Sequence, residues 1–376
     1  MEGAQRGVRQ QSDAGICGDQ ILSDHIVSGA ALDRRGKALR FRSCAWNNGP
    51  MTELPLVLTP KTLACARQIV AAHVPVSSVY RWPLIEQATG TSTWIKHENH
   101  NPTGAFKVRG GLTYMTHLVE SGPSRGVISA SRGNHSQSLA FAGAVFGVPV
   151  TIVVPEGNSA DKNSATRAWG AEVIVHGRDF QEAVERSQAL AEERGLTQVP
   201  AFHPWLVEGV ATYAAELHEQ SPDLDVIYVP VGMGSGICAN IAVRDLIGAS
   251  TEIVGVVSKN APAYALSFEV GRPVATETAD TFVDGVACRT PDPAAVGVIT
   301  RGAARIVQIS ETQAADAMTL MYKATHNLAE PAGALGLAAA LAERDQNKGR
   351  RVGLILTGGN ADYTVLHQAF NSSRPI

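Results

Sequence analysis

Several common features are scarce or absent in this sequence, and each shortage excludes a class of protein. Aromatic residues make up only 6% of the 376 residues, which is low for an all-β protein that relies on aromatic cross-strand pairs. No apolar run reaches the length of about 20 residues that a membrane-spanning helix needs. The 32 basic and 35 acidic residues nearly cancel, and this balance gives no sign of a basic surface. We therefore expect a small-molecule ligand, with no nucleic-acid partner and no membrane partner.

Metal-binding patterns are absent as well. The five cysteines are scattered and form no CxxC pair, which argues against a zinc site. The stretch KHENH, residues 96–100, has neither HExxH spacing nor a paired cluster elsewhere in the chain. No apolar core of a signal peptide is visible. We expect a cytoplasmic protein without a metal ion.

The first fifty residues differ from the rest of the chain. They show no sustained periodicity and mix arginine with aspartate, unlike a signal peptide or a transit peptide. Met51 opens a stretch that looks like a natural start. We expect residues 1–50 to form a poorly ordered extension.

From about residue 94 onward, short apolar runs alternate with longer helical patterns such as DFQEAVERSQALAEERG and SETQAADAMTLMYKATHNL. Continuous apolar runs are typical of buried parallel strands, so the alternation predicts an α/β chain. The length of 376 residues predicts two domains. The apolar runs are TWIKHE, GVISAS, VTIVVP, AEVIVHG, DVIYVPV, EIVGVVS, ARIVQIS and RVGLILT.

Two stretches interrupt this alternation. Residues 198–209, QVPAFHPWLVEG, contain two prolines and are expected to cross between the domains. Residues 276–295 predict a long loop, and long loops in compact domains often carry function. We place a large domain in residues 51–120 and 205–376, and a small domain in residues 121–204.

Three strand-to-helix turns have the composition of ligand sites. Gly232–Gly236 follows the run DVIYVPV, and the backbone N–H groups of such a loop can bind a phosphate. Ser131–His135 follows GVISAS and can bind a carboxylate. Thr357 ends RVGLILT, and its hydroxyl can hydrogen-bond a ring nitrogen. Ligands gather at the carboxyl ends of strands in open α/β sheets, although each turn alone also fits an ordinary tight turn or helix N-cap.

A fourth motif, NPTGAFKVRGG, places Lys107 just after the turn Asn101–Gly104. Most lysines are solvated surface charges. A lysine after such a turn can instead point into a closed pocket, where desolvation favours its neutral, nucleophilic form. One ligand that carries a phosphate, a ring nitrogen and an aldehyde for the lysine would satisfy all four motifs. Pyridoxal 5'-phosphate has all three groups.

The motifs TGAFKVRG, SRGNHSQ, GMGSG and TGGN occur in this order along the chain. Together they resemble the threonine/serine dehydratase branch of the fold-type II pyridoxal-phosphate enzymes, which have the tryptophan synthase β-like fold. The resemblance covers roughly residues 55–370. It implies two domains, each with a mostly parallel open sheet flanked by helices, and a cofactor in the cleft between them. It also implies a homodimer.

The resemblance assigns roles to individual residues of these motifs. Lys107 would form the Schiff base with the cofactor and move the Cα proton of the substrate. The residues implied to bind the cofactor are Phe106, Lys107, Asn134, Gly232, Met233, Gly234, Ser235, Gly236 and Thr357. The residues implied to surround the substrate carboxylate are Ser131, Gly133, Asn134 and His135. The implied reaction is α,β-elimination from a 3-hydroxy amino acid such as L-threonine or L-serine, which gives a 2-oxo acid and ammonia.

Some positions depart from the family pattern. Arg132 stands where the family usually has a small residue, and in racemases a serine there is the second proton donor. Arg132, assisted by Arg289, could bind a second acidic group on a substrate such as 3-hydroxyaspartate; the alternative is an arginine that points into solvent. Val257 and Lys259 lie where the family's divalent-cation site has acids, so we expect no magnesium ion there.

Sixteen residues follow Asn360, which leads us to expect no C-terminal regulatory domain of the kind found in biosynthetic threonine dehydratases. Four functions stay open on these grounds. The first is a threonine or serine dehydratase, and the second is a 3-hydroxyaspartate ammonia-lyase. The third is an amino-acid racemase or a β-replacement synthase on the same fold. The fourth, a non-catalytic binder, is disfavoured because the chain retains Lys107.

Overall fold

The computed structural model describes residues 58–372, and the predicted extension at residues 1–50 lies outside them. The strands are β1 (Val79–Arg81), β2 (Ser92–His97), β3 (Val127–Ala130), β4 (Val150–Val154), β5 (Glu172–Val175), β6 (Thr197–Gln198), β7 (Val226–Pro230), β8 (Glu252–Ser258), β9 (Arg305–Ile309) and β10 (Arg351–Leu356). The α-helices are α1 (Pro60–Ala71), α2 (Pro83–Thr89), α3 (Lys107–Glu120), α4 (Asn134–Phe146), α5 (Ala160–Ala168), α6 (Phe180–Arg194), α7 (Pro204–Gln220), α8 (Ser235–Leu246), α9 (Ala263–Val270), α10 (Pro293–Gly302), α11 (Glu311–Thr325), α12 (Pro331–Ala342) and α13 (Tyr363–Ser372). The short 3-10 helices are η1 (Glu98–His100) and η2 (Asp284–Val286).

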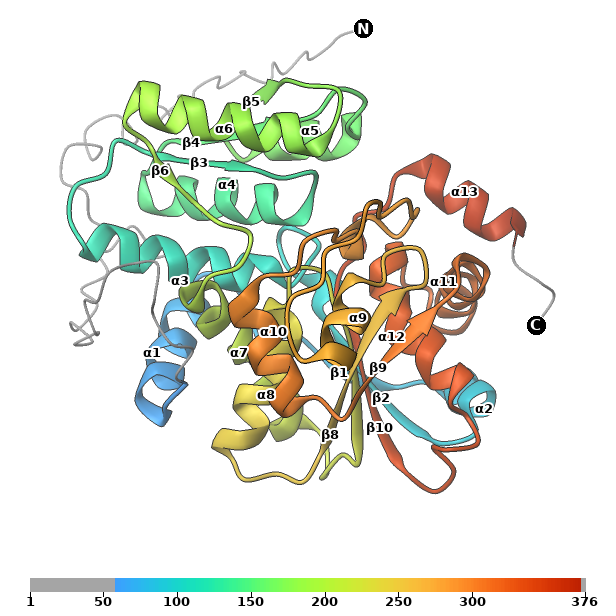
Figure 1. Cartoon of the computed structure of the whole chain (residues 1–376). Helices are drawn as coiled ribbons and strands as arrows, with labels where there is room; N and C mark the ends of the chain where they lie inside the picture. The colour runs from blue at the N-terminus through green and yellow to red at the C-terminus, as the bar shows by residue number, and fades with distance from the viewer. Residues whose placement is uncertain (1–57, 373–376) are drawn as a thin grey trace, which may run out of the picture.

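Two sheets form the framework of the molecule (Figure 1). The large sheet has six strands in the order β1-β2-β10-β7-β8-β9, and only β1 is antiparallel to its neighbour. The small sheet has four parallel strands in the order β5-β4-β3-β6. Helices flank both sheets (Figure 1). This arrangement confirms the predicted α/β class with mostly parallel open sheets.

All eight apolar runs form strands, and the central strands β4 and β7 are buried at every position. Full burial explains their continuous apolar sequences, because helices cover both faces of a parallel sheet. Sequence analysis missed β1 and β6. These strands are three and two residues long and partly exposed, so neither has an apolar run that would mark it.

Helix ends follow from local capping. The Asp179 side chain accepts a hydrogen bond from the Glu182 backbone N–H at the start of α6, and Gly195 ends this helix with a φ of 66°. Ser310 and Gln313 form a capping box at the start of α11. The two helical patterns singled out in the sequence therefore form helices with clear stop and start residues.

Helix α3 lies between the two sheets (Figure 1) and packs against α4 and α7. Its apolar residues Val108 and Leu112 belong to the same hydrophobic cluster as Val127 and Ile152 of the small sheet. The small sheet takes all its strands from residues 127–198. Because α3 shares the core of that sheet, the predicted domain boundary at residue 120 stays a prediction.

The carboxyl ends of the parallel strands lead into the motifs found in the sequence. β3 leads into Ser131–His135, β7 leads into Gly232–Gly236, and β10 leads into Thr357. The predicted loop at residues 276–295 contains only η2 and the start of α10. Within residues 58–372, no helix is both long enough and apolar enough to cross a membrane.

Candidate active site

Lys107 is the first residue of α3 and follows a tight turn. The Gly104 N–H donates to the Asn101 carbonyl at 2.8 Å, and Gly104 has a φ of 68°. A Cβ at this position would lie 2.4 Å from Oδ1 of Asn360. Both the backbone conformation and the close approach of Asn360 therefore require glycine here.

The backbone around Lys107 is fixed from two sides. The Phe106 N–H donates to the Thr357 carbonyl at 3.0 Å, and Ala105 forms an antiparallel bridge with Gly358. The Ser138 hydroxyl of α4 donates to the Lys107 carbonyl at 2.5 Å. These contacts bring the lysine motif, α4 and the TGGN motif together in one place.

The Lys107 side chain is half-buried, and its Nζ lies 5.4 Å from the centroid of the Phe106 ring. Burial lowers the pKa of Lys107 to about 8, against an ordinary value of 10.5, while the Glu330 carboxylate acts in the opposite direction. A neutral amine is thus accessible near physiological pH. Only the neutral form is a nucleophile toward an aldehyde.

The loop Gly232–Gly236 joins β7 to α8. Gly234 has a φ of 101°, and a Cβ on Gly232 would lie 2.4 Å from a carbonyl oxygen of the loop that contains η2. The Tyr264 hydroxyl donates to the Met233 carbonyl at 2.9 Å and holds the loop in place. The first turn of α8 leaves backbone N–H groups without intrahelical partners, and groups of this kind can bind a phosphate.

Within residues 58–372, several buried polar side-chain atoms have no hydrogen-bond partner, and two of them lie in the predicted ligand turns that follow β3 and β10. These two are Oγ1 of Thr357 and Nε2 of His135. Burial, with a further contribution from Lys107, lowers the pKa of His135 to about 3, so the imidazole is neutral. An unpaired buried hydroxyl costs about 1–3 kcal/mol. Both atoms are therefore available to a ligand.

The Asn134 side chain joins the small-sheet side of the molecule to the large-sheet side. Its Nδ2 donates to both carboxylate oxygens of Glu330, at 2.8 and 3.0 Å. Its Oδ1 accepts a hydrogen bond from Nδ2 of Asn360 at 2.8 Å. The same Asn360 amide donates to the Thr103 carbonyl, in the turn before Lys107, at 2.8 Å.

Sequence analysis missed Glu330, which directly precedes α12. Its side chain is buried and makes no capping hydrogen bond to its own helix. Burial raises the pKa of Glu330 to about 7, although the Asn134 amide opposes this rise. A Glu-Pro pair at a helix start is an ordinary pattern, so the sequence offered no sign that this carboxylate faces Asn134.

Sequence analysis also missed an ion pair beside the Ser131–His135 loop. Nζ of Lys162, in α5, lies 3.0 Å from Oδ2 of Asp284, in η2. A Cβ on Gly133 would lie 3.2 Å from the Cδ atom of Lys162, so the alkyl chain of this lysine covers the glycine. The long loop at residues 276–295 therefore reaches the small-sheet side through Asp284.

The remaining predicted substrate residues have partners of their own. The Ser131 hydroxyl accepts a hydrogen bond from the Gly133 N–H at 3.4 Å. Arg132 is exposed, and its guanidinium lies 5.6 Å from the centroid of the Phe180 ring. Arg289 is exposed, and its Nε donates to the Thr276 carbonyl at 3.5 Å. Contact of the two arginines with a substrate stays a prediction.

These residues fit pyridoxal phosphate on three counts. Lys107 offers an amine of lowered pKa, Gly232–Gly236 offers a glycine loop at a helix start, and Thr357 offers a buried hydroxyl without a partner. Within residues 58–372, no group of three or more His, Cys, Asp or Glu side chains could hold a metal ion.

Comparisons with known proteins give the following matches. The family described as "Pyridoxal-phosphate dependent enzyme" matches residues 70–358. The chain is 34% identical to the L-threonine ammonia-lyase of Thermotoga maritima over 77% of this chain and 72% of that protein. It is 32% identical to the L-threo-3-hydroxyaspartate ammonia-lyase of a Pseudomonas species over 76% of this chain and 89% of that protein. The solved structure of processed threonine deaminase isoform 2 from Solanum lycopersicum superposes with a TM-score of 0.78 at 28% identity, over 86% of this chain and 96% of that one.

Proposed function

The chain belongs to the threonine/serine dehydratase branch of the fold-type II pyridoxal-phosphate-dependent enzymes, and on that premise we propose that it deaminates a 3-hydroxy amino acid such as L-threonine or L-serine. In this reaction the Cα–H and Cβ–O bonds break and water leaves. The resulting enamine becomes an imine, which water hydrolyses to a 2-oxo acid and ammonia. Atoms and electrons balance without an external oxidant or reductant.

The observation that carries this proposal is the placement of Lys107. Its amine has a lowered pKa, and its motif is hydrogen-bonded to Thr357, whose buried hydroxyl has no partner within the described part of the chain. The neutral amine can attach the cofactor, and once freed it can take the proton from the substrate Cα.

Pyridoxal phosphate, when bound, supplies an aldehyde that condenses with amines and a ring that withdraws electrons from the substrate Cα. Gly232–Gly236 would hold its phosphate and Thr357 would hold its ring nitrogen. Asn134 would hold the ring's 3'-oxygen, in exchange for part of its contact with Glu330. A hydroxyl at position 357, unlike a carboxylate, would leave the ring nitrogen of the bound cofactor largely unprotonated. The weaker electron withdrawal favours prompt β-elimination.

A second candidate is deamination of 3-hydroxyaspartate. The relative with that activity in its name is matched over 89% of its length, against 72% for the L-threonine ammonia-lyase. This substrate needs a cation for its second carboxylate. Lys162 lies against Gly133 of the predicted substrate loop, although Asp284 already pairs with it. Arg132 would have to leave the face of Phe180 to serve the same purpose.

The test is a 2-oxo acid assay of the purified protein with L-threonine, L-serine, D-serine and both diastereomers of 3-hydroxyaspartate. We expect L-threonine or L-serine to give the highest kcat/KM, and Lys107→Ala to give no 2-oxo acid. A tenfold advantage for 3-hydroxyaspartate, about 1.4 kcal/mol in the transition state, would establish the second candidate instead. Absence of 2-oxo acid from every compound would refute the elimination, and racemisation and β-replacement would then be assayed.

We further propose that the protein is a cytoplasmic homodimer. The resemblance to the family supports the dimer. Size-exclusion chromatography with light scattering measures the mass directly. A mass equal to that of one 39.7 kDa chain would contradict the dimer.

A further inference from the structure

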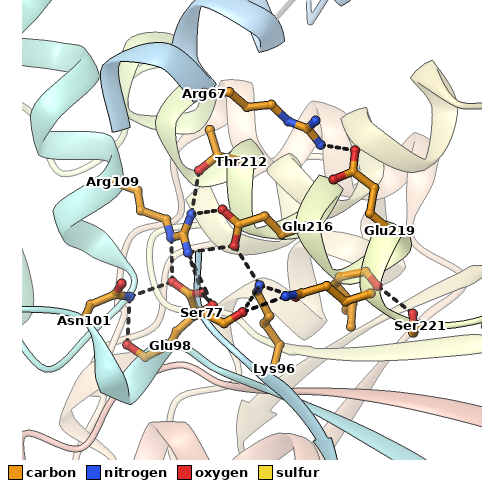
Figure 2. Close-up of polar contacts among 12 residues, drawn as sticks. Arg67, Ser77, Lys96, Glu98, Asn101, Arg109, Thr212, Glu216, Glu219 and Ser221 are labelled. Carbon is orange, nitrogen blue, oxygen red and sulfur yellow. Dashed lines mark hydrogen bonds and ion pairs between the residues drawn. The ribbon is translucent and has the colours of Figure 1, made fainter. Parts of the chain in front are cut away.

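Four buried charged side chains form a cluster next to the first turn of α3 (Figure 2). We call Lys96, Glu98, Arg109 and Glu216 the ionic cluster. Lys96, Glu98 and Arg109 are completely buried, and Glu216 is nearly so. The four residues come from β2, η1, α3 and α7. Buried charges of this kind are rare in protein cores unless they are paired.

Arg109 is the centre of the ionic cluster and lies two positions after Lys107. Its Nε and Nη2 donate to the two carboxylate oxygens of Glu98, at 2.8 and 3.0 Å. Its Nη1 and Nη2 donate to the two oxygens of Glu216, at 2.7 and 2.9 Å. Nη1 also donates to the Thr212 hydroxyl at 3.0 Å. The Arg109 guanidinium therefore makes a bidentate contact with each of two carboxylates, at different edges of its plane. Together these contacts fix both the position and the rotation of the guanidinium.

Lys96 completes the charge balance of the ionic cluster. Its Nζ donates to the Glu216 carboxylate at 2.7 Å, to the Ser77 carbonyl at 2.8 Å and to the Gln220 side chain at 2.8 Å. Two cations therefore face two carboxylates with no charge left over. Neither the cations nor the carboxylates can relax into water, since all four side chains are buried.

The ionic cluster also holds the turn that precedes Lys107. Asn101, the first residue of that turn, donates through Nδ2 to the Glu98 carboxylate at 2.7 Å and to the Glu98 carbonyl at 2.9 Å (Figure 2). The Asn101 carbonyl in turn accepts the Gly104 N–H. Glu98 thus binds the chain on both sides of Lys107, through Asn101 before it and Arg109 after it.

Stability alone does not explain why the ionic cluster consists of charged side chains. Well-packed apolar side chains of similar volume are often as stable as a buried ion pair, or more so. What an apolar replacement cannot give is a directional contact at a set angle. The catalytic lysine needs a defined direction, because small displacements of a reacting group cost a large part of its rate.

We propose that Arg109 is a positioning residue for Lys107, and that its contacts with Glu98 and Glu216 set the rotation of the first turn of α3 and so aim the lysine amine at the cofactor. This inference rests on the proposed role of Lys107 as the cofactor lysine. It assigns to the second cation of the FKVR motif a task distinct from binding substrate or cofactor.

The test compares the wild type with Arg109→Lys and Thr212→Val in the full chain. Arg109→Lys keeps the charge, so the carboxylates stay paired, but it loses the planar fork. Thr212→Val removes a single contact of Nη1 and is the milder change. Amine-selective labelling of the apoprotein over a range of pH, read by mass spectrometry, gives the pKa of Lys107. Equilibrium titration with pyridoxal phosphate gives its affinity.

We expect the Arg109→Lys variant to bind pyridoxal phosphate about tenfold more weakly than wild type. We also expect the pKa of Lys107 to move from about 8 toward its ordinary 10.5, because a misdirected side chain is less desolvated. Thr212→Val should shift both quantities in the same direction and by less. Tyr228→Phe is the matched control. It removes the hydroxyl of Tyr228 in β7, which donates to the Glu343 carboxylate at 2.6 Å, and should lower stability while leaving both quantities unchanged.

An unchanged Lys107 pKa and an unchanged affinity in both Arg109→Lys and Thr212→Val would overturn the proposal. The proposal also fails if Tyr228→Phe shifts the two quantities as much as Arg109→Lys does, because general destabilisation would then explain them. Failure of the proposed function looks different. In that case the wild type binds pyridoxal phosphate and Lys107 titrates as expected, yet no 2-oxo acid forms.

Discussion

Replacing Thr357 by valine should change the stability of the apoprotein and the affinity for pyridoxal phosphate in opposite directions. Thr357 is 4% exposed, and its hydroxyl has no hydrogen-bond partner within residues 58–372. Valine has nearly the same shape and no hydroxyl. Because an unpaired buried polar group costs about 1–3 kcal/mol, Thr357→Val should raise the unfolding free energy of the apoprotein by an amount in that range.

The cofactor-bound protein should respond in the opposite sense. If the hydroxyl binds the ring nitrogen, Thr357→Val removes that hydrogen bond and leaves the nitrogen buried and unpaired. A loss of about 1–3 kcal/mol corresponds to roughly 5- to 150-fold weaker binding. Urea unfolding of the apoprotein and titration with pyridoxal phosphate measure the two effects separately.

Thr319 provides a matched control for this experiment. It lies in α11, is 4% exposed, and its hydroxyl also lacks a partner among the residues the structure describes. Thr319→Val should raise the apoprotein's stability by a similar amount and leave cofactor affinity unchanged. A less stable Thr357→Val apoprotein would show that the hydroxyl is satisfied within the folded chain. The inference that the Thr357 hydroxyl stays unpaired until it binds the ring nitrogen of the cofactor would then be refuted.

Further predictions concern titration and the surface arginine. Attachment of pyridoxal phosphate to the apoprotein should slow about tenfold per pH unit below about pH 8, because Lys107 is then protonated; a stopped-flow rate that stays flat there contradicts the lowered pKa. Glu330 has a folded-state pKa raised to about 7 from 4.5, so its contribution to stability is present below about pH 4.5 and lost as pH rises through 7. Glu330→Gln should therefore match wild type in urea unfolding near pH 5 and exceed it near pH 8, and equal midpoints at pH 8 would count against the burial effect. Arg132→Ala should lower stability by about 0.5–1 kcal/mol through loss of the contact with Phe180. Arg132→Ala should also leave kcat/KM for L-threonine within about twofold of the wild-type value, because Arg132 is exposed. Loss of a preference for 3-hydroxyaspartate in this variant would instead show that Arg132 binds the substrate.

The sheets could be predicted because burial on both faces leaves a clear trace in the sequence. β7 and β8 consist almost entirely of buried apolar residues, so their runs are visible without knowledge of the fold. β1 has exposed positions and pairs only with β2, at the edge of the large sheet. An edge strand of three residues has too few apolar positions to be distinguished from a loop.

The site was partly predictable for a related reason. Its motifs follow parallel strands, and parallel pairing brings the ends of those strands to one edge of a sheet. Glu330 and Lys162 do not follow strands, and each meets its partner more than a hundred residues away in the sequence. Lys96 and Glu98 stand at the polar end of the run TWIKHE, and charged residues are usually exposed. Only the fold shows that both are buried.

The pairing of β2 with β10 has a consequence for the order of events in the cell. The chain before Lys107 is hydrogen-bonded to the segment around Thr357 and Gly358, about 250 residues later in synthesis. β10 also lies between β2 and β7 in the large sheet. A growing chain on the ribosome therefore lacks both a central strand of this sheet and Thr357 until β10 and the residue after it have emerged. A chain that ends before β10 would therefore contain Lys107 but lack Thr357, which we propose holds the ring nitrogen of the cofactor.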